Sequence, residues 1–243
     1  MIGRSHWGWA ISVFALVHGA WHGAWCWERL TPELESMGHQ VIAMDLPCED
    51  GSASFDDYAA IVCATLSDHP GDDLILVGHS LAGNAIPLVA AHRPVRRLIY
   101  LCAFIPIPGQ SIAQQMADDK EMLNPDFAHG LSERDSEGRR TWVDQELAHF
   151  HLFGDCDDVT ASAAFERLRP QAMHPYRLPC SLPALPTVDS TYVVCTEDRI
   201  VNPNWARRSA RERLQADLVE LLGSHSPFLS RPRDLAELLH GLT

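Results

Sequence analysis

Short hydrophobic runs alternate with stretches of helical periodicity along most of this chain. Apolar runs of strand length are found at 12–18, 40–46, 73–77, 97–104, 191–195 and 217–222. Helical spacing of apolar residues is found at 25–37, 56–67, 81–92, 204–214 and 232–242. Such alternation is typical of a mostly parallel sheet with helices on both faces, so we predict an α/β fold.

The alternation breaks between residues 106 and 186, where proline, aspartate and aromatic residues are frequent. Helical spacing persists there only near 111–118, 140–150 and 159–168. We interpret this segment as an inserted helical lid. The predicted organisation is a core of residues 1–105 and 187–243 that carries a lid, or cap, over residues 106–186.

Length and charge narrow the classes of function. A chain of 243 residues with 46% hydrophobic residues is long enough to bury one substantial core. Its formal net charge of -13 disfavours nucleic-acid partners and anionic membrane surfaces, both of which need basic residues. A neutral or weakly charged small molecule fits this charge better.

The cysteines and the N-terminal segment bear on the cellular compartment. Seven cysteines occur without a Cys-x-x-Cys pair, which predicts buried thiols in a reducing compartment such as the cytoplasm. Arg4 and the apolar run 7–17 could be taken for a signal peptide. We reject that interpretation because the run leads directly into His18-Gly19-Ala20, which we assign to the active site. No apolar stretch reaches the roughly 18 residues that a membrane span requires.

A serine lies where an aliphatic strand meets a helix, in the segment Gly78-His79-Ser80-Leu81-Ala82-Gly83. This pattern predicts a nucleophile elbow, a turn so sharp that the positions two before and two after the serine must be small. Gly78 meets this need fully. Ala82 stands where the usual pattern has glycine, and Gly83 comes one residue late.

The helix that begins after Ser80 directs unpaired N–H groups towards its hydroxyl. The Leu81 N–H is therefore one candidate donor of an oxyanion hole, and the Ala20 N–H, in the loop after the first strand, is the second. Three tryptophans follow this loop. We interpret them as helix packing rather than as a substrate platform: Trp21, Trp25 and Trp27.

The general base and its partner are expected after the late strands. In α/β folds that carry a serine on a nucleophile elbow, the three catalytic residues follow the chain order serine, acid, histidine. Of the 13 histidines, His225 follows the last predicted strand and is the candidate base. The preceding strand ends in Glu197 and Asp198, and we prefer Asp198 as the carboxylate that holds the imidazole in the required tautomer.

Two histidine pairs have spacings compatible with metal ligation, His18 with His22 and His149 with His151. Neither pair has an evident third ligand, and the first lies in the oxyanion loop. We therefore expect no metal.

Several segments together resemble the plant methyl esterase and hydroxynitrile lyase family of α/β-hydrolases, of which this chain looks like a bacterial-type member. These segments are Val17 to Trp25, Asp45-Leu46-Pro47, Gly78 to Leu81 and Cys195 to Asp198. The resemblance implies a catalytic Ser80, Asp198 and His225, oxyanion N–H groups at Ala20 and Leu81, and no cofactor. It also implies substrate contacts, which we assign to Gly19, His79 and the lid aromatic Trp142.

The resemblance leaves the choice between esterase and lyase to two positions. The cyanohydrin-splitting members resemble this chain but carry threonine or asparagine at the position of Gly19, and one type has lysine at the position of Ser226. Without a charge there to stabilise departing cyanide, hydrolysis of a small, largely apolar carboxylic ester is the favoured activity. Lyase or thioesterase activity and a non-catalytic ligand-binding role stay open as alternatives, as does the oligomeric state, with a homodimer as one option.

Overall fold

The computed structural model describes residues 11–69 and 71–243. Arg4 and the first part of the apolar run considered as a signal peptide thus lie outside the described residues. Within the described ranges we find no helix with the length and hydrophobicity that a bilayer span needs.

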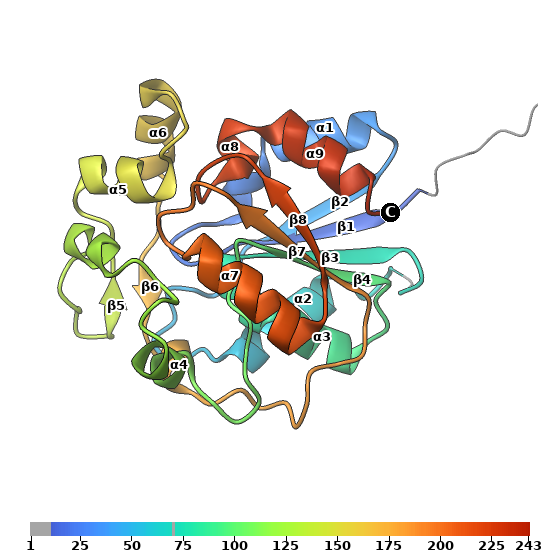
Figure 1. Cartoon of the computed structure of the whole chain (residues 1–243), viewed down its shortest axis with the longest axis horizontal. Helices are drawn as coiled ribbons and strands as arrows, with labels where there is room; N and C mark the ends of the chain where they lie inside the picture. The colour runs from blue at the N-terminus through green and yellow to red at the C-terminus, as the bar shows by residue number, and fades with distance from the viewer. Residues whose placement is uncertain (1–10, 70) are drawn as a thin grey trace, which may run out of the picture.

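Six parallel strands form one sheet in the order β2-β1-β3-β4-β7-β8 (Figure 1). Their bounds are β1 Val13–Val17, β2 Gln40–Met44, β3 Leu74–His79, β4 Arg97–Leu101, β7 Ser190–Cys195 and β8 Asp217–Leu221. The four inner strands are almost wholly buried because helices cover both faces, which explains their continuous apolar runs. The edge strands β2 and β8 are partly exposed. All six predicted strands are confirmed, with β2 and β4 ending earlier than expected.

Helices cover the two faces of the sheet (Figure 1). The helices α1 (Leu30–Ser36), α8 (Pro227–Ser230) and α9 (Pro232–His240) gather on one face, whereas α2 (Phe55–Thr65) and α3 (Ile86–His92) lie on the other. The helix α2 begins with a capping box, in which the side chains of Ser54 and Asp57 each accept a backbone N–H of the other residue.

Two predicted helices are wrong in extent, and both are interrupted near a proline. The segment predicted as one helix over 25–37 forms a 3-10 helix, Ala24–Trp27, and then α1, with Pro32 in the first turn of α1. The segment predicted over 81–92 forms a 3-10 helix, Ser80–Asn84, and then α3, with Pro87 in its first turn. Proline lacks an N–H and its ring collides with the preceding turn, so it starts a helix more readily than it continues one.

The C-terminal part of the core also departs from the prediction. The expected helix over 204–214 is α7 (Pro203–Ser209) followed by one π-helical turn, Ala210–Leu214. The short helix α8, directly after His225, was not predicted.

Apart from residues 185–189, which lie at the amino ends of the strands, most residues between β4 and β7 gather beyond the carboxyl ends (Figure 1). They form α4 (Ile112–Asp118), α5 (Gln145–Leu152), α6 (Asp158–Phe165) and an antiparallel pair, β5 (Arg139–Arg140) with β6 (Gln171–Ala172). The helix predicted over 140–150 begins five residues late, at Gln145. Arg140 pairs with β6 instead, and Asp144 caps α5 by accepting the Leu147 N–H.

Gly83 lets the turn after Ser80 lie against the backbone that follows β4. A Cβ at this position would overlap the Phe104 carbonyl oxygen and lie 2.9 Å from Ala103 Cβ. The Phe104 N–H donates to the Ser80 carbonyl at 3.0 Å, which holds the two segments together. Gly83 therefore serves this close approach rather than the elbow pattern in which it appears one residue late.

We predict that Gly83→Ala lowers the free energy of unfolding by about 1–3 kcal/mol, because backbone must shift to admit the methyl group. Urea denaturation measures this change. Gly241→Ala is a matched control, since a Cβ there meets nothing closer than 3.4 Å. Equal stability of the two variants would contradict the packing argument.

Candidate active site

Ser80 lies at the carboxyl end of β3 in a strained backbone conformation. Its φ is +52°, in the left-handed region that residues other than glycine seldom adopt. A Cβ at Gly78 would lie 2.9 Å from Ile86 Cγ2, so the position two residues before the serine has to be small. The side chain of Ser80 is buried apart from 6% of its surface, and it faces a cavity described below. This is the turn that the sequence pattern predicts.

The structure brings together the three residues selected from the sequence as nucleophile, base and acid. Nε2 of His225 lies 3.0 Å from Oγ of Ser80, and Nδ1 of His225 lies 2.8 Å from Oδ2 of Asp198. The other oxygen of Asp198 accepts the N–H groups of Ile200 at 2.7 Å and Val201 at 3.0 Å. A carboxylate bound in this way favours the tautomer in which Nδ1 of His225 carries the proton. Nε2 is then free to accept a proton from the serine.

The loops that carry the acid and the base follow adjacent strands. Asp198 comes after β7 and is buried, whereas its neighbour Glu197 is exposed. His225 comes after β8, and residues on either side of it are tied to the segment between β4 and β7, because Ser224 Oγ donates to Asp155 and Arg231 Nε lies 3.1 Å from the same carboxylate. Sequence reasoning missed Asp155, since no local pattern links it to His225.

His79 lies beneath the base rather than in contact with a substrate. Its Nε2 donates to the His225 carbonyl at 2.9 Å, and its ring is fully buried. Gly19 is packed against the same residue, since a Cβ there would lie 2.8 Å from both His79 Nδ1 and Ser80 Cβ. The expectation that Gly19 and His79 contact substrate is therefore corrected: both pack behind the nucleophile and support its position.

Two further buried histidines are held in neutral form near the site. His18 donates from Nδ1 to the Gly19 carbonyl and accepts the Leu46 N–H at Nε2, which only a neutral ring can do. His22 donates from Nδ1 to the Ala20 carbonyl. Burial lowers the pKa of His18 to about 4 and that of His22 to about 3. The same cause places the pKa of His79 well below its ordinary value.

A cavity of about 480 Å³ opens above Ser80. Its volume is in the range of small-molecule pockets, about 300–1,000 Å³. Its wall is mainly apolar and includes Ala20, Trp21 and Phe127. Trp142, expected to face the substrate, instead lies behind Trp21, with ring centroids 5.8 Å apart. Both expectations are therefore corrected. Trp21, expected to pack in a helix, lines the cavity, and Trp142, expected to contact the substrate, packs against Trp21.

The loop after β1 brings Ala20 to the same cavity as Ser80. The next residue, Trp21, has a φ of +63°, so the chain turns sharply at this point. Leu81 is the second residue of the 3-10 helix that Ser80 begins, and its N–H has no acceptor within that helix. The assignment of the Ala20 and Leu81 N–H groups to an oxyanion hole stays a prediction.

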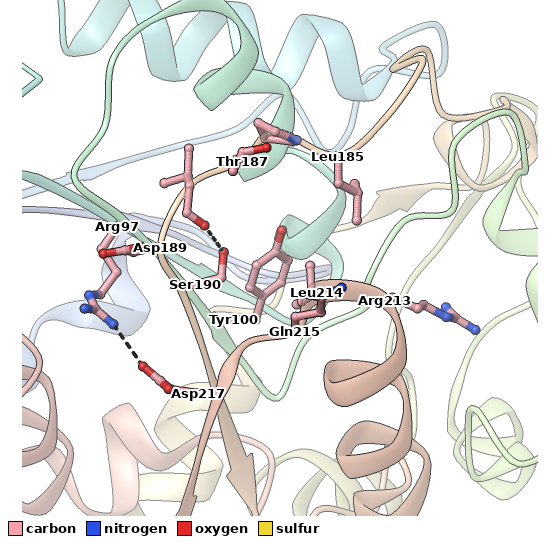
Figure 2. Close-up of a pocket in the computed structure, with 12 residues that line it drawn as sticks. Arg97, Tyr100, Leu185, Thr187, Asp189, Ser190, Arg213, Leu214, Gln215 and Asp217 are labelled. Carbon is pink, nitrogen blue, oxygen red and sulfur yellow. Dashed lines mark hydrogen bonds and ion pairs between the residues drawn. The ribbon is translucent and has the colours of Figure 1, made fainter.

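A larger cavity, of about 570 Å³, lies at the opposite end of the sheet. Its lining includes the first residues of β4, β7 and β8, and Figure 2 shows Arg97 and Asp217 paired along one side. In open α/β sheets, ligands bind outside the carboxyl ends of the strands. We therefore place the active site in the smaller cavity, which holds Ser80.

One group of side chains near the site could offer ligands to a metal ion. Potential ligand atoms of Cys102, Asp198 and His225 all lie within 4.8 Å of one another. Burial raises the pKa of Cys102 well above its ordinary value, so its sulfur is a protonated thiol, a poor ligand. Asp198 and His225 already use their facing atoms to bond each other. This donor set fits a metal poorly.

Comparisons with known proteins relate this chain to one family. Residues 14–238 match the Alpha/beta hydrolase family. Methyl jasmonate esterase 1 of Vitis vinifera is 25% identical over 249 residues, which cover 93% of this chain and 94% of the relative. Polyneuridine aldehyde esterase of Rauvolfia serpentina is 27% identical over 249 residues, which cover 93% of each chain.

Solved structures show the same fold. A pyrethroid hydrolase from Sphingobium faniae JZ-2 superposes with a TM-score of 0.80 at 24% identity, covering 96% of this chain and 97% of the other. The crystal structure of polyneuridine aldehyde esterase gives a TM-score of 0.81 at 23% identity, covering 96% and 99%.

The close packing at Gly19 generates a prediction about substitution there. We expect Gly19→Thr to lower kcat/KM for any substrate turned over at Ser80 by about 100-fold, because the new side chain displaces the nucleophile or His79 by enough to misalign them. Steady-state kinetics measures the loss. Gly241→Thr is a control of equal chemistry at a position with a φ of -66°, where a Cβ meets nothing closer than 3.4 Å. Unchanged kinetics in Gly19→Thr would contradict the packing described.

The neutral buried histidines predict acid sensitivity. Below pH 6.5 the unfolded chain binds protons at these rings and the native protein does not. The free energy of unfolding therefore decreases as the pH is lowered from 6.5 to the native pKa, which is about 4 for His18 and about 3 for His22. Each ring should contribute about 1 kcal/mol per pH unit to this fall.

Urea denaturation at pH 6.5, 6.0, 5.5 and 5.0 tests this prediction. His22→Phe keeps an aromatic ring among its neighbours and should make the pH dependence of the free energy of unfolding less steep. The exposed His92 offers the control His92→Gln, which should leave the slope unchanged. A His22→Phe slope equal to that of the parent protein would count against the assigned protonation state.

Proposed function

The chain belongs to the α/β-hydrolase family, and from that membership and the geometry at Ser80 we propose that it is a serine hydrolase of carboxylic esters. The observation that carries the proposal is the continuous hydrogen-bonded series from a buried carboxylate through His225 to the Ser80 hydroxyl, with distances of 2.8 and 3.0 Å. The esterase names of the similar proteins support the same reaction class. The substrate is a small, largely apolar ester, in keeping with the wall of the cavity.

The proposed reaction proceeds through an acyl-enzyme. The Ser80 oxygen attacks the ester carbonyl carbon while Nε2 of His225 takes the hydroxyl proton. The negative charge that forms on the carbonyl oxygen is stabilised by the N–H groups of Ala20 and Leu81. When the carbon–oxygen bond to the alcohol breaks, the leaving oxygen takes the proton from His225.

The second half of the reaction releases the acid. His225 takes a proton from water, the resulting hydroxide attacks the acyl carbon, and the bond to Ser80 breaks as the serine oxygen recovers that proton. Asp198 stays ionised throughout and stabilises the imidazolium that forms in each half. The triad, the two N–H donors and water suffice for this scheme.

We further propose that residues 106–186 act as the lid of this site, over a core of residues 1–105 and 187–243. Most residues that line the cavity come from this segment, which supports that role. The seven cysteines are all free, in keeping with the cytoplasmic location inferred from the sequence. Exclusion of nucleic acid and formation of a homodimer stay predictions.

The same triad chemistry serves cyanohydrin cleavage, thioester cleavage and slow-turnover ligand binding, and these are the competing functions. Gly19 and Ser226 carry no charge that would assist departing cyanide. Ser226 is also fully buried, and its hydroxyl is without a partner among the described residues, so it is not available to a substrate. Product analysis on cyanohydrins, thioesters and esters of one acyl group separates these functions.

We predict that a fluorophosphonate labels Ser80 stoichiometrically and that Ser80→Ala abolishes both the label and ester hydrolysis, by about 10⁴-fold or more. Intact mass spectrometry and a panel of p-nitrophenyl and methyl esters of graded size measure the two effects. Ser226→Ala removes a neighbouring hydroxyl that lies outside the cavity and should keep the label. A folded parent protein that never reacts with the probe and hydrolyses no ester would reject the proposed function.

A further inference from the structure

Positive charge collects around the cavity that holds Ser80. Of the charged side chains that line it, four are cations and one is a carboxylate. The cations are Lys120, Arg134, Arg140 and Arg177, and the carboxylate is Asp119. The whole chain has the opposite balance, with 32 acidic and 19 basic residues. An electropositive rim on so acidic a protein is therefore a local feature.

Two of these five charged side chains have partners within the protein: Asp119 forms an ion pair, and Arg140 donates hydrogen bonds to main-chain carbonyls. Asp119 lies 2.7 Å from the Arg208 guanidinium. Arg140 is half-buried and donates from Nε to the Ser132 carbonyl and from a terminal nitrogen to Ala128. These two residues hold the wall together.

The other three cations are exposed and lack a charge partner. Throughout 11–69 and 71–243, no carboxylate pairs with Lys120, Arg134 or Arg177. Lys120 donates only to the Met116 carbonyl, at 3.3 Å. Arginine and lysine at protein surfaces commonly find acidic neighbours, and this chain has a large excess of them. Three uncompensated cations at one opening are thus available to a ligand.

These cations come from separate parts of the lid segment. Lys120 follows α4, Arg134 precedes β5, and Arg177 ends the 3-10 helix Pro175–Arg177. Ser80 lies on the same cavity but belongs to the core sheet. A substrate with its ester at Ser80 would pass between apolar side chains before its far end met this rim.

We propose that the natural substrate is an ester that carries a carboxylate or a similar anionic group at the end remote from the scissile bond, bound by Lys120, Arg134 and Arg177. This inference rests on the proposed ester hydrolysis and specifies its substrate class. It departs from the expectation, drawn from the net charge alone, of a neutral or weakly charged substrate, while the part of the ester that lies within the cavity stays largely apolar. Net charge describes the average surface, whereas binding depends on the charges that face the ligand.

Matched esters test the proposal. Half-esters of linear dicarboxylic acids with p-nitrophenol, in a series of chain lengths, are compared with esters in which the free carboxylate is replaced by the isosteric primary amide. A second series carries the same two groups on the alcohol. In at least one series we expect kcat/KM for the carboxylate to exceed that for the amide by about tenfold at an optimal length, since several weak exposed charge contacts together account for a factor of this size.

The double variant Arg134→Gln/Arg177→Gln tests whether these cations cause the preference for the carboxylate ester. It should lower kcat/KM for the carboxylate ester about five- to tenfold, mainly through KM, and leave the amide ester unchanged. The matched control is Arg211→Gln/Arg233→Gln, which removes two exposed cations away from the cavity. The control is needed because either pair makes the net charge more negative and repels anions at long range.

Two failures are distinguishable. If the parent protein hydrolyses neither the carboxylate nor the amide esters and Ser80 resists the fluorophosphonate, the proposed function itself is wrong. If both kinds of ester are hydrolysed with equal kcat/KM in both series, or if the two paired variants have equal effects, ester hydrolysis stands and the anion-binding rim is overturned.

Discussion

A buried carboxylate at Asp198 is the constraint on which the rest of the site depends. Its two oxygens are fully committed, one to the main-chain N–H groups of Ile200 and Val201 and the other to the imidazole of His225. Because the charge is fixed by these donors, the ring can hold only one useful tautomer, and its second nitrogen must face Ser80. The sheet serves this arrangement by ending β3, β7 and β8 at the same edge, so that residues far apart in the chain meet within hydrogen-bond distance.

A layer of neutral histidines packs around this hydrogen-bonded pair. His79 fixes the main chain of His225, and His18 and His22 hold the carbonyl groups of the turn that carries Ala20. Each of these rings is buried, so protonation would place an uncompensated cation beside a base that must itself become positive during the reaction. Desolvation keeps them neutral, and the positive charge of the reaction is thereby confined to His225.

The segment between β4 and β7 and the rest of the chain contribute different groups to the cavity that holds Ser80. Ser80, Asp198 and His225 come from the strands and loops of the central sheet, while the segment between β4 and β7 provides most of the apolar wall and the cations that line the cavity. The two parts are joined through Asp155, which contacts both Ser224 and Arg231 on either side of the base. Under the proposed function, a change in this segment would alter which ester is bound without altering the proposed triad.

The sequence by itself determined the strands and the choice of Ser80, Asp198 and His225 as candidates, which the structure places within hydrogen-bond distance of one another. Buried parallel strands need continuous apolar runs, and the sharp turn at Ser80 needs a small residue at Gly78, so both leave local marks in the chain. The extents of two helices could not be predicted from the sequence. Pro32 and Pro87 each lie in the first turn of a helix, and apolar periodicity alone does not show that the helix starts there instead of continuing from the residues before it. Only the tertiary structure decided what each aromatic ring faces: Trp21 lines the cavity and Trp142 lies behind it, although nothing in their local sequences distinguishes them. Only the tertiary structure, too, brought cations from three separate segments to one opening, because side-chain direction and charge pairing arise from packing between distant parts of the chain.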